Sequence, residues 1–72
     1  MTSFNERLKE IRINHSVTQK QLSIDLDLSE RGIQSYELGE RKPGLDALIA
    51  LADYFNVSLD YLTGRSDNPE IQ

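Results

Sequence analysis

The apolar residues of this chain fall into five short stretches that are separated by polar turns, prolines and glycines. Within each stretch they recur at every third or fourth position, as Phe4, Leu8 and Ile11 do, which is the spacing of one face of an α-helix. Isolated helices of this length are marginal in water. The pattern therefore predicts an all-α protein in which five short helices stabilise one another by packing into a compact bundle.

Capping residues mark the predicted helix boundaries. Thr18, with Gln21 three residues later, has the form of a capping box, and Ser29 and Ser58 are natural N-caps. Gly39 stands just past the third helix, where glycine adopts a left-handed conformation at no steric cost. The resulting helices cover residues 4–14, 18–26, 29–38, 46–55 and 58–63.

The boundaries define one domain over residues 1–64, with a helix-turn-helix at 18–38 and C-terminal helices at 45–63. Residues 65–72 lack apolar periodicity, so we expect a flexible polar tail there. A chain of 72 residues is near the lower size limit for a self-sufficient core. It contains no cysteine, so neither a disulfide nor a thiolate metal site can support the fold.

The composition also limits the chemistry that we expect. The one histidine, His15, has no cysteine partners for a zinc site, so we expect no metal and no cofactor. Asp53 and Asp60 come without a nucleophile or a glycine-rich phosphate loop, so we expect no enzymatic activity and no small-molecule substrate. The N-terminal stretch MTSFNERLKEIR is too charged for a signal peptide, and no apolar run is long enough for a membrane span. We therefore expect a cytoplasmic protein.

The acidic charge of the chain is confined to its C-terminal part. The formal net charge is −4 at pH 7. Residues 1–44 contain equal numbers of acidic and basic side chains, seven of each, whereas residues 45–72 contain five acidic residues and only Arg65 as a base. The whole excess of acid therefore lies outside the first 44 residues, which bears on the partners that each part can have.

The second and third predicted helices are joined by a very short turn, which is the arrangement of a helix-turn-helix, whose second helix enters a major groove. The stretch TQKQLSIDLDLSERGIQSYELGERKP resembles the helix-turn-helix of the phage Cro and CI repressors and of the wider XRE-type regulators. The likeness continues in FNERLKEIR before it and LDALIALADYFNVSLDYLTG after it, over about residues 4–64. It implies a lambda-repressor-like fold and a sequence-specific regulator of transcription, most often a repressor, that binds a pseudo-palindromic double-stranded DNA operator as a homodimer.

The resemblance places four side chains at positions that point into the groove in relatives, namely Glu30, Arg31, Gln34 and Ser35. Their chemistry suits base reading, since Arg31 can donate twice to guanine and Gln34 can pair with adenine. An ionised Glu30 can only accept, so it either selects cytosine, orients Arg31, or repels a wrong site. The helix that Ser29 caps begins with main-chain N–H groups that can hold a phosphate.

The resemblance also implies supporting roles. Gln19 matches a glutamine that bonds a phosphate and braces the recognition helix, and Arg41 and Lys42 fall in a loop that touches the DNA backbone. Arg12 and Glu37 match a buried structural ion pair. Contacts of these kinds fix a protein on the backbone without a net positive charge, so a net charge of −4 does not exclude a specific site.

Three residues depart from the family pattern. Asp27 occupies a turn position that is usually glycine, and Ser16 occupies another where glycine is common, so both are expected to strain the backbone at positive φ. Gly32 lies inside the recognition helix, where it costs roughly 0.5–1 kcal/mol relative to alanine. Its missing side chain is a possible means of close approach for the helix or for DNA.

We expect the homodimer to form through the fifth helix, where the pattern leaves Leu59, Tyr61 or Leu62 partly exposed. A two-fold dimer would place two recognition helices about 34 Å apart, one turn of DNA. The alternative is a protein-interaction module, such as an antitoxin or an anti-repressor partner, that keeps the fold without reading DNA. Glu30 and the acidic composition favour that alternative.

Overall fold

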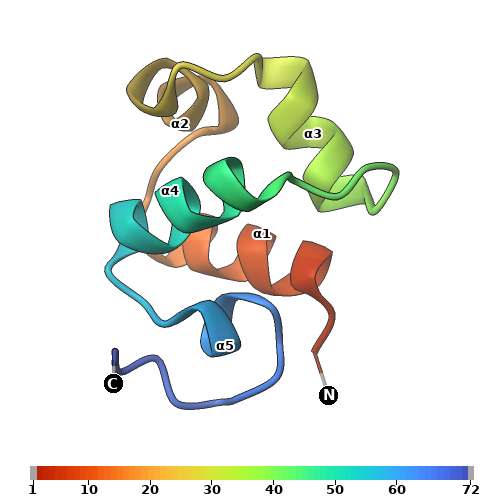
Figure 1. Cartoon of the computed structure of the whole chain (residues 1–72). Helices are drawn as coiled ribbons and strands as arrows, with labels where there is room; N and C mark the ends of the chain where they lie inside the picture. The colour runs from red at the N-terminus through yellow and green to blue at the C-terminus, as the bar shows by residue number, and fades with distance from the viewer. Residues whose placement is uncertain (1, 72) are drawn as a thin grey trace.

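Five α-helices make up the regular structure of residues 2–71, the part of the chain that the computed structural model describes (Figure 1). They confirm the predicted all-α fold. None of them is long and apolar enough to cross a membrane. In chain order they are α1 (Phe4–Asn14), α2 (Gln19–Leu26), α3 (Glu30–Leu38), α4 (Leu45–Phe55) and α5 (Leu59–Leu62). Once the N-caps are set apart, their boundaries agree with the predicted ones, except that α4 begins one residue earlier and α5 ends one residue earlier.

The predicted N-caps are formed, but the capping box is not. The hydroxyl oxygen of Thr18 accepts from the main-chain N–H of Gln21 at 3.0 Å, and those of Ser29 and Ser58 cap α3 and α5 in the same way. The prediction that the Gln21 side chain returns to the cap is wrong, because its amide donates to Asp25 Oδ1 at 2.8 Å instead. In a capping box the side-chain oxygen of Gln21 would accept from the Thr18 N–H; here the side chain is turned toward Asp25, whose ionised carboxylate lies one turn along the same helix and accepts a strong hydrogen bond.

Each helix contributes one of the five largest fully buried side chains. They are Leu8, Leu22, Ile33, Leu51 and Leu62, all 0% exposed. The expectation that Leu62 is partly exposed is therefore wrong. α5 is a single turn of four residues, and Leu62 is its buried residue. Because Leu62 packs in the core, it is not available to contact a second copy.

The helices are arranged so that the helix-turn-helix lies at one end of the molecule. In Figure 1, α2 and α3 lie at the top, α1 and α4 cross the middle, and α5 lies at the bottom with the C-terminal segment passing beneath it. The acidic segment that begins at α4 thus ends on the side of the molecule away from α2 and α3. Asp60, Asp67 and Glu70 are thereby separated from the candidate recognition helix, whereas the other two acidic residues of the segment, Asp46 and Asp53, belong to α4.

The segment after α5 makes contacts that differ from the expected free tail. Asp67 Oδ1 accepts from the guanidinium of Arg7 at 2.9 Å, and the carbonyl oxygen of Pro69 accepts from the N–H of Ser58 at 3.0 Å. Arg7 is 4% exposed, and its guanidinium lies 3.9 Å from the ring centre of Tyr61. These contacts hold the segment against α1 and α5.

The two turn residues that replace the glycines of the family pattern, Ser16 and Asp27, have the left-handed backbone conformation that is costly for residues other than glycine. Ser16 has φ of 56° and Asp27 has φ of 54°, and both lie in the left-handed region that non-glycine residues rarely adopt. A third such residue, Asn56 at 55°, ends α4 and was not predicted from the sequence. Asparagine tolerates this conformation better than serine does, so Ser16 is the most strained of the three.

Replacing Ser16 with glycine is expected to raise the free energy of unfolding by about 0.5–1 kcal/mol. Relief of left-handed strain gains about 1–2 kcal/mol, from which the added freedom of glycine in the unfolded chain removes about 0.4–1 kcal/mol. Urea denaturation would measure the difference. The matched control is Ser58→Gly, where φ is −72° and no gain is expected; equal gains at both positions would contradict the strain argument.

A side-chain bond between helices connects α2 to α4. The hydroxyl of Tyr54 donates to Asp25 Oδ2 at 2.6 Å. This bond, assisted by desolvation and by the negative charge of Asp25, raises the pKa of Tyr54 above its ordinary value. The protonated phenol is therefore favoured by folding.

The linkage gives a prediction for alkaline pH. Because the folded-state pKa of Tyr54 is raised, the stability it contributes is present below about pH 10, the usual pKa of tyrosine, and is lost as pH rises through the folded-state value. The thermal unfolding temperature of Tyr54→Phe should accordingly fall less steeply above pH 10 than that of the parent protein. Identical slopes would show that the phenol does not couple to folding.

Candidate nucleic-acid interface

The candidate recognition helix α3 has one buried and one exposed face. Gly32, Ile33, Tyr36 and Glu37 are buried against the rest of the domain. Four side chains of the opposite face are exposed, Glu30, Arg31, Gln34 and Leu38, and Ser35 is half-buried beside them. The four residues expected to point into a groove thus lie on the side of α3 that is free for a ligand, although Ser35 is less accessible than the other three.

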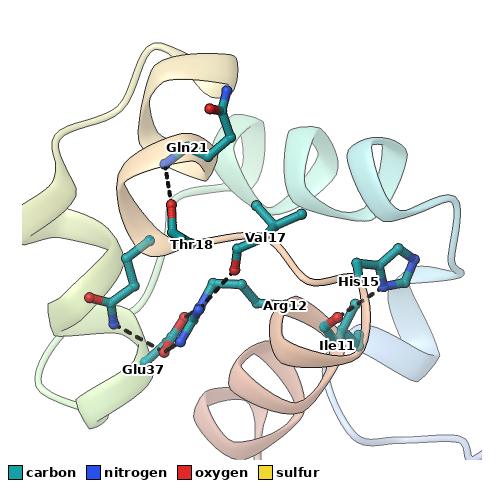
Figure 2. Close-up of polar contacts among 8 residues, drawn as sticks. Ile11, Arg12, His15, Val17, Thr18, Gln21 and Glu37 are labelled. Carbon is teal, nitrogen blue, oxygen red and sulfur yellow. Dashed lines mark hydrogen bonds and ion pairs between the residues drawn. The ribbon is translucent and has the colours of Figure 1, made fainter.

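Arg12 and Glu37 form a bidentate ion pair that joins α1 to α3 (Figure 2). Arg12 Nε lies 2.5 Å from one Glu37 carboxylate oxygen and Nη2 lies 3.0 Å from the other. The remaining Nη1 donates to the carbonyl oxygen of Val17 at 2.9 Å. Since the two side chains are 13% and 4% exposed, the pair is largely desolvated and fixes the turn before α2 together with both helices.

Gln19 completes this network at the start of α2. Its amide Nε2 donates to Glu37 Oε1 at 3.1 Å, so it braces α3 in the manner expected from the resemblance. Each amide nitrogen carries two hydrogens, and one of them is left for another acceptor. The first main-chain N–H groups of α2 lie beside it and have no acceptor within their own helix.

A groove of about 650 Å³ lies where α2, α3 and the end of α1 meet. Its lining includes Gln19 and Glu30, together with Lys9, Lys20 and Leu38, for which the sequence predicted no role. Lys20 directly follows Gln19 in the sequence, and this neighbouring position could have predicted that Lys20 lies at the candidate interface. Leu38 is 69% exposed, a large apolar side chain on the outer face of a helix whose other exposed residues are polar.

The glycine inside α3 lies close to the cap of that helix. A Cβ at position 32 would lie 2.9 Å from Ser29 Oγ, which accepts from the Gly32 N–H at 2.9 Å. The equivalent residue of α2 is Gln21, whose N–H donates to Thr18 at 3.0 Å, so such a cap does not by itself require glycine. Gly32 is buried and lies on the face of α3 opposite the candidate reading positions.

The loop after α3 presents two cations. The N–H groups of Glu40 and Arg41 both donate to the carbonyl oxygen of Ser35, at 3.0 and 3.3 Å, which holds the loop against the end of the helix. The side chains of Arg41 and Lys42 are exposed and form no ion pair with any residue in 2–71. They are consequently available to an anion.

The same range, residues 2–71, contains no group of three or more histidine, cysteine or acidic side chains that would hold a metal ion. The candidate interface consists instead of a polar helix face, two helix N-termini and a basic loop. These are the parts with which a helix-turn-helix domain contacts bases and phosphates.

Comparison with known proteins identifies the class to which this domain belongs. A family profile described as helix-turn-helix matches residues 8–62, which include all or most of each of the five helices. The chain belongs to this family, the Cro/CI or XRE type of helix-turn-helix transcriptional regulators, as the resemblance of residues 4–64 predicts. Proteins of this family are DNA-binding regulators of transcription.

Among individual relatives, the chain is similar to the HTH-type transcriptional regulators YobD and ImmR of Bacillus subtilis. It is 35% identical to YobD and 37% identical to ImmR, with 90% of this chain aligned in each case. It is also 34% identical, over 93% of its length, to the cryptic phage CTXphi transcriptional repressor RstR of Vibrio cholerae. The chain spans 58%, 51% and 60% of the lengths of these three relatives.

A solved structure shares the fold. The crystal structure of a transcriptional regulator from Listeria innocua superposes with a TM-score of 0.81 and 35% sequence identity. The match covers 86% of this chain and 58% of that one.

Proposed function

We propose that this chain is a sequence-specific double-stranded DNA-binding domain that regulates transcription by occupying an operator. The observation that carries the proposal is the exposed face of α3, where Arg31 and Gln34 project beside Glu30. Behind this face, the Arg12–Glu37 pair and Gln19 hold the helix from α1 and α2. A rigid helix with exposed base-reading side chains is what major-groove recognition requires.

Arg31 and Gln34 are the proposed principal readers. Arginine can donate two hydrogen bonds to O6 and N7 of guanine, and glutamine can pair with N6 and N7 of adenine. Glu30 lies at the start of α3 and lines the groove that also contains Lys20. Its carboxylate would accept from the N4 amino group of cytosine, and it would repel a phosphate that approached in the wrong register.

Backbone contacts are assigned to Gln19, the N-termini of α2 and α3, and the loop cations Arg41 and Lys42. These groups position the domain and carry no sequence information. Ser35, half-buried at the edge of the exposed face, is proposed to contact the rim of the groove. α5 and the C-terminal segment, which carry Asp60, Asp67 and Glu70, lie at the opposite end of the molecule from α3 in Figure 1, so these acidic residues oppose the approach of DNA less than the net charge suggests.

We further propose that the protein binds as a homodimer on two half-sites about 34 Å apart. Of the three expected contacts, Leu62 is excluded by its burial, Tyr61 is half-buried beneath Arg7, and Leu59 is 40% exposed. Leu59 is therefore the proposed anchor of the dimer contact. Ile49 on α4 is 39% exposed, and the two side chains line one surface groove. Exposed apolar residues that adjoin in this way are typical of an interface.

Repression is the proposed outcome of operator binding, through competition with polymerase. The name of RstR describes a repressor, whereas that of BcrR from Enterococcus faecalis, 34% identical over 59 residues, describes an activator. Activation by contact with polymerase would use the same DNA-bound state. The site therefore supports regulation of transcription more directly than it supports a choice between repression and activation.

The test is selection of bound sequences from a pool of random duplexes at low salt. We expect enrichment of a two-fold motif, with half-sites one helical turn apart. If no sequence is enriched, the proposal fails, and the protein-interaction module becomes the better account of the fold. Enrichment of a single, unpaired half-site would retain DNA reading but reject the homodimer.

A further inference from the structure

A second concave site lies beside the candidate interface. Its volume is about 430 Å³, and it is lined by the start of α1, the end of α3, the α3–α4 loop, α4 and the residue after α5. Cavities that take small organic ligands range from about 300 to 1,000 Å³. Its lining comes from segments far apart in the chain, so no local sequence pattern predicts it.

One wall of the cavity is apolar and contains an unused donor. Phe4 and Leu48 line it together with Tyr36, which is only 7% exposed. The Tyr36 hydroxyl forms no hydrogen bond within residues 2–71 and is not one of the fully buried side-chain atoms, so it is accessible to a molecule in the cavity.

Other residues of the lining favour an anion. Arg41 and Lys42 line the cavity and have no ion-pair partner among the described residues. Asn5 also lines it, and its side-chain amide lies 3.5 Å from where a Cβ on Gly39 would stand. The N–H groups of Phe4 and Asn5 belong to the first turn of the 11-residue helix α1, where orphan donors and the helix dipole attract negative charge. No acidic residue lines the cavity.

We propose that this cavity binds a small organic carboxylate with a flat apolar body. The carboxylate lies against Lys42, Arg41 and the start of α1, and the apolar body lies against Phe4 and Leu48. The Tyr36 hydroxyl donates a hydrogen bond to the ligand. An apolar surface with a few convergent polar groups is the usual composition of such a site.

Binding there is coupled to DNA, and this step rests on the proposed function. Arg41 and Lys42 are the loop cations assigned to the DNA backbone, so a carboxylate that engages them lowers the affinity for the operator. By linkage, the operator lowers the affinity for the carboxylate by the same factor. The cavity is then the effector site of the regulator.

The direct test is titration of the ¹⁵N-labelled protein, without DNA, with sodium benzoate. Benzamide serves as the matched neutral ligand and acetate as the matched anion without a ring. We expect benzoate to shift the amide signals of Phe4, Asn5 and Gly39, with a Kd at least about fivefold lower than that of either control. Equal affinity for benzamide would overturn the proposal, and so would unchanged signals at these residues.

Matched variants separate recognition from folding. Tyr36→Phe keeps the ring and is expected to weaken benzoate binding by about 3–10-fold, the range for one lost hydrogen bond. Lys42→Gln should weaken it by a similar factor, whereas Lys9→Gln, an exposed lysine outside the cavity, should have no effect. Retained dispersion of the amide signals would confirm folding. Equal losses for both lysine variants would indicate non-specific charge attraction and reject the site.

Two further measurements identify the source of the anion and the coupling. If inorganic phosphate shifts the same signals at lower concentration than benzoate, the cavity is part of the DNA-backbone contact, and the carboxylate proposal is rejected. With a selected duplex, saturating benzoate should weaken DNA binding by about 3–10-fold, and an unchanged affinity would reject the effector role. If no duplex is bound at all, the proposed function fails, while the benzoate titration still decides whether the cavity is a ligand site.

Discussion

Replacing Arg12 with methionine is expected to lower the free energy of unfolding by about 3–5 kcal/mol, the usual cost of removing one partner of a buried ion pair. The Glu37 side chain is 4% exposed, so the variant leaves a desolvated carboxylate with the single amide donor of Gln19. A domain of this size has a total stability of about 5–10 kcal/mol, so the loss is a large share of it. Thermal and urea unfolding would measure the change.

The control for this prediction is the double variant Arg12→Met, Glu37→Leu. Because an apolar pair of similar volume avoids the uncompensated charge, the double variant should recover most of the lost stability. The coupling energy from the four proteins isolates the pair from effects of size. If the free energy of unfolding falls in the double variant by the sum of the decreases in the two single variants, the pair does not act as a unit.

Replacing Arg31 with alanine has the largest effect expected on recognition. It should cost about 1–3 kcal/mol on the selected operator and should relax the preference at one base pair of each half-site. Lys42→Ala should instead weaken all duplexes by similar factors and should reduce the slope of log K against log salt by about one. Binding to a panel of single-base variants at several salt concentrations distinguishes the two.

The two substitutions test the division between reading and positioning. Equal, sequence-independent losses for Arg31 and Lys42 would show that α3 does not read bases through Arg31. A loss that is confined to one base pair for Lys42 would place the loop, and not the exposed face of the helix, in contact with base edges. Both side chains are exposed, so neither substitution is expected to disturb the core.

The sequence predicted the helices, their caps and the outward positions of α3, because these depend on local spacing. Ser29 and Gly39 mark the ends of α3 through interactions within a few residues, and such interactions can be read from the chain. The Arg12–Glu37 pair was expected from resemblance alone. Its residues are 25 positions apart, and no local pattern connects them.

What the sequence did not predict depends on contacts between distant segments. Leu62 and Leu59 both lie on an apolar stripe, and only the packing of α5 decides that the first is buried and the second is exposed. Asp67 looked like part of a free tail, but it pairs with Arg7, which is 60 residues away. The cavity at Tyr36 was missed for the same reason, since five segments meet to form it.

The distribution of the buried side chains has a consequence for how the molecule opens. Each helix supplies one of the five largest fully buried residues of a single cluster, so no pair of helices retains a complete core when another leaves. Detachment of any helix therefore approaches the free energy of global unfolding, and amide hydrogens in all four longer helices should exchange with similar protection factors. Local opening of α3 would then cost nearly as much free energy as unfolding the whole domain, although one face of this helix is exposed.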